Sequence, residues 1–117
     1  MSIRYIEPGA RLSSATIYNG VVYLAGYVAD AAMGKSVAEQ TADILAQIEE
    51  TLVQAGSDKT RLLKVNIWLS DIGTIAEMNA VWDKWVVAGK TPARATVEAK
   101  LADPRWAVEM MVEAAVG

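Results

Sequence analysis

The sequence predicts one α+β domain over residues 1–117, with the order strand, strand, helix, strand, helix, strand, strand. Three observations predict this class. An Asn-Gly pair joins two β-rich runs, and two segments have apolar residues at helical spacing after a Ser/Thr-x-x-Glu motif. The remaining apolar segments alternate with period two, as half-buried strands do.

The first two strands form a predicted hairpin. Residues 15–19 and 21–28 flank Asn19-Gly20, and both turn residues tolerate the positive φ that a two-residue hairpin turn requires. We therefore expect these two strands to pair antiparallel.

Residues 36–55 form the clearest helix. Ser36 and Glu39 fit a capping box, and Gly56 is a natural C-terminal stop. The apolar stripe is Val37, Thr41, Ile44, Leu45, Ile48 and Leu52. The helix positions expected in solvent are Gln40, Asp43, Gln47, Glu50 and Gln54.

The second half of the chain predicts a strand, a helix and two strands. Residues 62–70 alternate, with Leu63, Val65, Ile67 and Leu69 on one face. Residues 74–88 form the helix, with Thr74 and Glu77 as a second capping box and Gly89 as its end. The last strands are residues 93–99, after Pro92, and residues 107–116, after Pro104.

The sheet has a face that the helices do not cover. Two helices cover one face only, yet residues 21–28 and 107–116 have apolar side chains on both faces. In the last strand Val108, Met110 and Val112 share one face, and Glu109, Met111 and Glu113 share the other. We expect the uncovered face to pack on another subunit.

The composition excludes several classes of function. Without histidine or cysteine, Ser-His-Asp triads, Cys-His dyads and ordinary zinc sites cannot form, and we expect no metal and no cofactor. The net charge of −3, with scattered basic residues, argues against a nucleic-acid partner. No apolar run is long enough to span a membrane, and no apolar signal-like segment occurs near residue 1, so we expect a cytosolic protein.

Arg94 is a charged residue in an otherwise apolar strand, so we expect it to pair with an acidic group. It follows Pro92 at the start of an apolar strand and shares a face with Thr96 and Glu98. One interpretation, favoured by the pattern alone, is an ion pair with Glu98 or Glu113 on a neighbouring strand. The other is a bidentate clamp for a ligand carboxylate, which the guanidinium geometry suits.

Several segments resemble the RidA/YjgF (RutC-like) family. Residues 91–98, TPARATVE, resemble its P-x-R-[ST/A]-x-V-[EQ] signature, and residues 112–116 resemble its E-A-[IV] ending. Residues 21–26, 55–57, 63–71 and 78–82 resemble further family segments, in order and at matching spacing. The resemblance covers nearly the whole chain, and residues 82–89 look closest to the YoaB-like branch.

The resemblance implies a chorismate-mutase-like fold, with two helices on one face of a mixed sheet, and a homotrimer with ligand clefts between subunits. It also implies an enamine/imine deaminase that hydrolyses species such as 2-aminoacrylate to 2-keto acids and ammonia. Neither histidine nor cysteine is essential to that chemistry.

Site residues follow from the resemblance by position. Arg94 binds the substrate carboxylate, Thr96 and Asn79 lie beside the ligand, and Gly26 brings backbone close to it. Met111 stands where deaminating relatives have a glutamate that orients water.

A thioether is a weak acceptor and takes up no proton, so the resemblance leaves two hypotheses. In the first, the chain is a weak deaminase in which Glu109 or Glu113, on the Met111 face, acts as the catalytic carboxylate. In the second, it binds small carboxylates such as 2-keto acids in the same cleft without turnover. Two further departures are Ala25 before Gly26, and Leu12 where deaminating relatives have a tyrosine.

Overall fold

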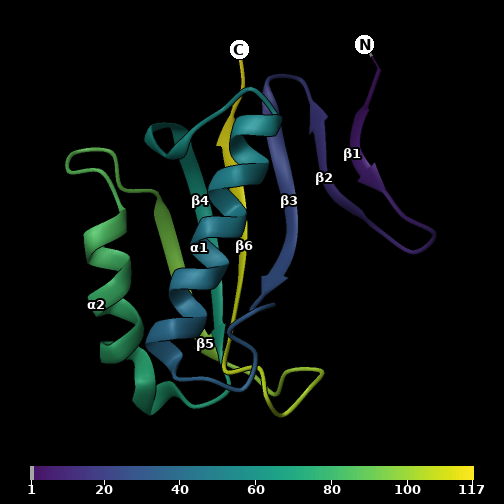
Figure 1. Cartoon of the computed structure of the whole chain (residues 1–117). Helices are drawn as coiled ribbons and strands as arrows, with labels where there is room; N and C mark the ends of the chain where they lie inside the picture. Colours follow the sequence, from purple (N-terminus) through teal and green to yellow (C-terminus); the bar gives the residue numbers. More distant parts are fainter. Residues whose placement is uncertain (1) are drawn as a thin grey trace.

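Two helices lie on one face of a six-stranded sheet in the computed structural model, which describes residues 2–117 (Figure 1). The strand order is β1-β2-β3-β6-β4-β5. The strands are β1 (Arg4–Pro8), β2 (Ser13–Tyr18), β3 (Val21–Val28), β4 (Leu62–Leu69), β5 (Ala93–Glu98) and β6 (Val108–Ala115). Only β4 and β5 pair parallel, so the sheet is mixed and the predicted α+β class is confirmed.

The edge strand β1 was not predicted. Only Ile6 of its five residues is buried, so the segment has no alternating apolar pattern to reveal it. Pairing with β2 holds it in place, with Ile6 opposite Ala15. The predicted hairpin is confirmed, because Asn19 and Gly20 have φ of 51° and 79° and join β2 to β3.

Helix α1 (Val37–Gln54) begins and ends as predicted. Glu39 N donates to Ser36 Oγ at 3.1 Å, and Gly56 follows the helix with φ of 84°. The prediction for Gln40 was wrong, since its side chain is buried. Its amide reaches the segment before β6, donating to Arg105 O at 3.0 Å and accepting from Ala107 N at 2.9 Å.

Helix α2 (Ile75–Trp85) is shorter than predicted. It ends at Trp85 because Val86 turns extended (ψ 152°), so Gly89 terminates no helix. The predicted capping box is also wrong, since Thr74 Oγ1 donates to Asp71 O. Glu77 instead accepts from Ala38 N, at 2.9 Å, and so caps the start of α1.

The core lies between the helices and the sheet. Val108, Met110, Val112 and Ala114 of β6 are fully buried there. In β4 the predicted face is wrong at its start: a register shift between Leu62 and Lys64 buries Leu62 and exposes Leu63.

The other face of the sheet is open, as the alternation predicted. Glu109, Met111 and Glu113 of β6 are half-buried on it. Large apolar side chains on this face are exposed: Tyr5, Tyr18, Tyr23, Leu63 and Val97. No helix within residues 2–117 is long and apolar enough to cross a membrane.

Candidate functional site

Arg94 lies at the start of β5, the edge strand of the sheet, on its helix-facing side. It is in register with buried Val65 of the neighbouring strand. Its guanidinium carbon lies 5.3 Å from the centroid of the Trp82 ring of α2, which is cation–π geometry. The Trp82 ring is itself packed against Trp85, with centroids 5.6 Å apart. The guanidinium is thus supported on one side by a fixed aromatic surface.

Arg94 has no ion pair within residues 2–117, so the interpretation as an ion pair with Glu98 or Glu113 is wrong. Glu98 accepts instead from Ile72 N at 3.0 Å, in the turn before α2. Glu113 is on β6, which is separated from β5 by β4. The donors of the guanidinium are therefore free to bind a carboxylate from outside the chain.

Two buried polar atoms on β5 and α2, the elements that carry Arg94 and Trp82, also lack a partner. Thr96 Oγ1 and Asn79 Oδ1 are shielded from solvent and accept or donate no hydrogen bond within the described chain. Thr96 is two residues beyond Arg94 on the same face of β5, and Asn79 is one helical turn before Trp82. Buried polar atoms are nearly always paired, and an exception asks for an explanation.

The second group of candidate residues lies on the open face of the sheet. Gly26 is in register with Met111, and Glu109 is two positions further along the ladder, opposite Val28 and on the same face. A Cβ added at Gly26 would collide with Glu109 Oε2, so a larger residue here would displace the carboxylate from the position that it occupies. The Glu109 side chain forms no hydrogen bond or ion pair within residues 2–117, and burial raises its pKa above the usual range of a glutamate.

Met111 and Glu113 complete this face. Met111 lies between Gly26 of β3 and Asn66 of β4, and Glu113 lies between Tyr23 and Lys64. Of the two glutamates, Glu109 is the one that lies against Gly26. The departure at Leu12 lies in the β1–β2 loop, where its side chain is 63% exposed.

A single chain does not bring the two groups together. Arg94, Thr96 and Asn79 lie beside α2, whereas Gly26, Glu109 and Met111 lie on the opposite face of the sheet. One strand also separates β5 from β6, which adds about 10 Å at usual strand spacing. The role of Trp82 was missed from the sequence, because its spacing fits the buried stripe of α2 equally well. No group of three or more acidic side chains within residues 2–117 is arranged to hold a metal ion.

Known proteins resemble this chain over its whole length. The sequence model of the family described as Endoribonuclease L-PSP matches residues 2–116. A RutC family protein of Haemophilus influenzae is 43% identical over 112 residues, and the alignment covers 96% of this chain and 97% of that protein. The RutC family protein YoaB of Escherichia coli is 41% identical over 116 residues, covering 99% and 100%.

Solved structures with similar sequences also have the same fold as this chain. A member of the YjgF protein family from Neisseria meningitidis superposes with a TM-score of 0.96 at 50% identity, covering 100% of this chain and 97% of its own. A chain from Salmonella typhimurium described as a translation initiation inhibitor has a TM-score of 0.89 at 43% identity, with 98% of each chain covered.

Proposed function

Because this chain belongs to the RidA/YjgF (RutC) family, we propose that it binds small 2-imino and 2-keto acids at Arg94 and hydrolyses the imines to 2-keto acids and ammonia. The proposal includes a cytoplasmic homotrimer in which each cleft combines Arg94 of one subunit with the open sheet face of the next.

The observation that supports this most is the unpaired polar cluster beside α2. A guanidinium without an ion pair is held over Trp82, and the strand and helix that carry these two residues also carry two buried oxygens without partners, Thr96 Oγ1 and Asn79 Oδ1. An arginine fork binds a carboxylate in a bidentate manner, which fixes the orientation of a small ligand. The two oxygens then face the remaining polar atoms of that ligand.

The open face supports the assembly. Exposed Tyr5, Tyr23 and Val97 form part of an apolar surface that is unusual for a monomer in water. Another copy of the chain that covers it brings Gly26 and Glu109 toward a foreign Arg94. Each cleft then contains one residue group from each of two subunits.

The chemistry needs one water and one proton carrier. Water adds to the carbon of the C=N bond, the nitrogen takes up protons, and ammonia leaves to give the 2-keto acid. Arg94 holds the carboxylate, and Asn79 Oδ1 accepts a hydrogen bond from the nitrogen. Glu109 of a neighbouring subunit donates the proton, since burial raises its pKa and keeps it protonated at higher pH than an ordinary glutamate.

One observation favours a second function, binding without turnover. Met111 occupies the register position opposite Gly26, and its thioether orients water poorly. A positioned acid or base contributes about 10²- to 10⁴-fold to the rate. If Glu109 does not supply that contribution, the cleft is a carboxylate-binding site only.

A coupled assay tests the proposal. A dehydratase generates 2-aminoacrylate, and the decay of 2-aminoacrylate is followed in three samples. One contains the parent protein, one contains Arg94→Ala and one contains neither. We expect the parent alone to accelerate decay. If 2-aminoacrylate decays at the spontaneous rate in the presence of the parent, and the parent still binds 2-ketobutyrate through Arg94, the second function, binding without turnover, would be established. A parent protein that neither accelerates the decay nor binds 2-ketobutyrate would reject the site.

A further inference from the structure

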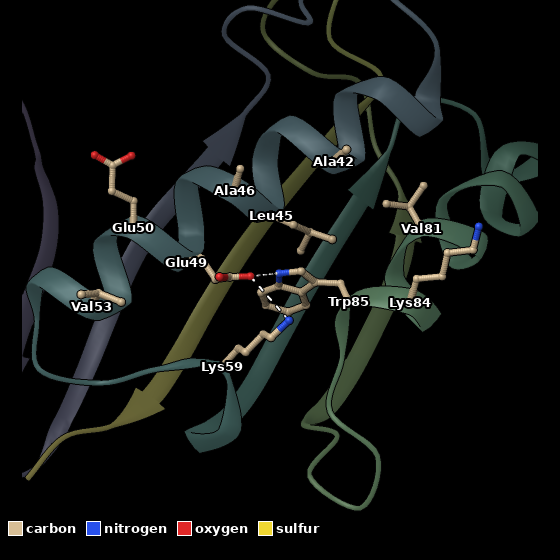
Figure 2. A pocket seen from close by; sticks show the side chains of 10 residues that line it. All are labelled: Ala42, Leu45, Ala46, Glu49, Glu50, Val53, Lys59, Val81, Lys84 and Trp85. Carbon is tan, nitrogen blue, oxygen red and sulfur yellow. Dashed lines mark hydrogen bonds and ion pairs between the residues drawn. The ribbon is translucent and has the colours of Figure 1, made fainter.

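A groove of about 650 Å³ lies between α1 and α2 and shares no residue with either group of candidate site residues (Figure 2). Most of its lining is apolar: Ala42, Leu45, Ala46, Val53, Val81 and Trp85. Its charged lining residues are Glu49, Glu50, Lys59 and Lys84. This combination of an apolar surface with a few charged groups is typical of sites for small molecules.

Small side chains on α1 create the groove. Ala42 and Ala46 are one helical turn apart, on the same side of the helix, and both are exposed. Only methyl groups therefore face α2 at these positions. Buried Leu45 lies at the base, and Val81 lines the groove from α2 (Figure 2).

A fixed indole crosses the groove. Trp85 Nε1 of α2 donates to Glu49 Oε1 of α1 at 2.6 Å (Figure 2). Lys59 Nζ lies 3.6 Å from the same oxygen and 5.5 Å from the Trp85 ring centroid. These contacts hold the indole in one orientation and compensate the charge of Glu49. A ligand would meet an ordered aromatic surface rather than a mobile side chain.

The position of this bridge limits what the groove can hold. Glu49 lies between Ala46 and Val53 along α1, so its bond to Trp85 interrupts the groove. A partner helix needs a continuous groove. The part of the groove between Ala42 and Trp85 has room for a small molecule with one or two rings.

The charges select the sign of the ligand. Lys84, one turn beyond Val81, has no ion pair within residues 2–117. Glu49 is already compensated, and the Glu50 side chain points away from Lys84 (Figure 2). Glu50 is also unpaired within residues 2–117, but it lies beside Val53, beyond the Glu49–Trp85 bond (Figure 2). In the part of the groove between Ala42 and Trp85, the unpaired charge is therefore the positive charge of Lys84.

We propose that this groove binds a small planar amphiphilic anion, an aromatic carboxylate or sulfonate. Its rings lie between Ala46 and Val81, against the edge of Trp85, and its anionic group lies at Lys84. The site is separate from Arg94 and does not depend on the function proposed there.

Calorimetric titration of 1-naphthoate into the full chain tests this, with 1-naphthalenemethanol as the neutral comparator. We expect saturable binding of the anion and weaker binding of the alcohol. Lys84→Gln should weaken naphthoate binding about two- to fivefold, the range for an exposed charge, whereas Lys90→Gln, outside the groove, should not. Arg94→Ala should leave the groove binding unchanged.

Filling the groove is the steric test. Ala46→Phe should abolish naphthoate binding, and Ala80→Phe, at an exposed position of α2 outside the lining, should not. Circular dichroism checks folding, and Ala42→Phe replaces Ala46→Phe if the latter does not fold.

Four results would overturn the proposal. The first is no saturable binding by the parent. The second is binding that Arg94→Ala abolishes and Ala46→Phe leaves intact, which would place the anion at Arg94. The third is equal affinity for the neutral alcohol. The fourth is self-association that Ala46→Phe abolishes, which would mean that a second copy of the chain covers the groove.

Discussion

Replacing Arg94 is the perturbation whose size the structure allows us to work out. The guanidinium has no ion pair within residues 2–117 and lies over Trp82, so Arg94→Ala breaks no internal ion pair and leaves no carboxylate unpaired in the chain. The change therefore acts mainly on the ligand. A hydrogen bond to a charged group contributes about 1.5 to 3 kcal/mol, which predicts an affinity for 2-ketobutyrate about 10- to 150-fold lower.

The assay is calorimetric titration of 2-ketobutyrate into the parent, Arg94→Ala and Arg94→Lys. The lysine variant keeps the charge and loses the fork, so we expect it to restore only part of the affinity. Glu98→Gln is a matched control, since Glu98 bonds to the backbone of Ile72 rather than to Arg94. Unchanged binding by Arg94→Ala, or full recovery by Arg94→Lys, would refute the bidentate clamp.

Three further predictions concern the open face and the charge of the chain. Met111→Glu should raise the rate of 2-aminoacrylate decay toward that of deaminating relatives. An unchanged rate would mean that Glu109 already acts as the catalytic carboxylate. Glu109→Gln should raise the melting temperature at neutral pH and have little effect below the ordinary glutamate pKa near 4.5. The sign follows because burial raises the pKa of Glu109 in the folded state, so the stability that protonated Glu109 contributes is lost as the pH rises through the folded-state pKa. Equal melting temperatures of the parent and Glu109→Gln at every pH would contradict this prediction. No RNA binding or cleavage is expected at physiological salt, because basic residues are scattered and the net charge is −3, and a salt-dependent gel shift at micromolar protein would overturn this.

The sequence predicted most of the fold because its local signals agree. Asn19-Gly20 favours a tight turn, and Ser36 with Glu39 caps the start of α1. The failures lie where long-range contacts decide. Gln40 has the sequence signature of a surface residue of a helix, yet its side chain forms two hydrogen bonds with the segment before β6 and a third with Lys35 O, just before α1. Strand β1 has one buried residue and depends on pairing with β2.

The candidate site was predictable as residue types and not as an arrangement. Arg94 stands out by its neighbours in the sequence, but alternation alone could not separate an ion pair with Glu98 from a free guanidinium. The structure decides this because the turn before α2 occupies Glu98. The support from Trp82 needs the packing of α2 on β5, which helical periodicity does not contain. The groove beside Ala46 depends in the same way on how α2 lies against α1.

The central claim is that the ligand cleft is shared between subunits, and subunit mixing tests it most directly. Arg94→Ala removes the carboxylate clamp, and Gly26→Leu should block the open face beside Glu109. Each variant alone should bind 2-ketobutyrate much more weakly than the parent, by about 10-fold or more for Arg94→Ala. Light scattering must first show a homotrimer for both variants. Unfolding and refolding an equal mixture should restore binding at about a quarter of the clefts, those with an intact residue group from each subunit. Mixed trimers that bind no ligand, or a parent protein that remains a monomer at micromolar concentration, would contradict the account.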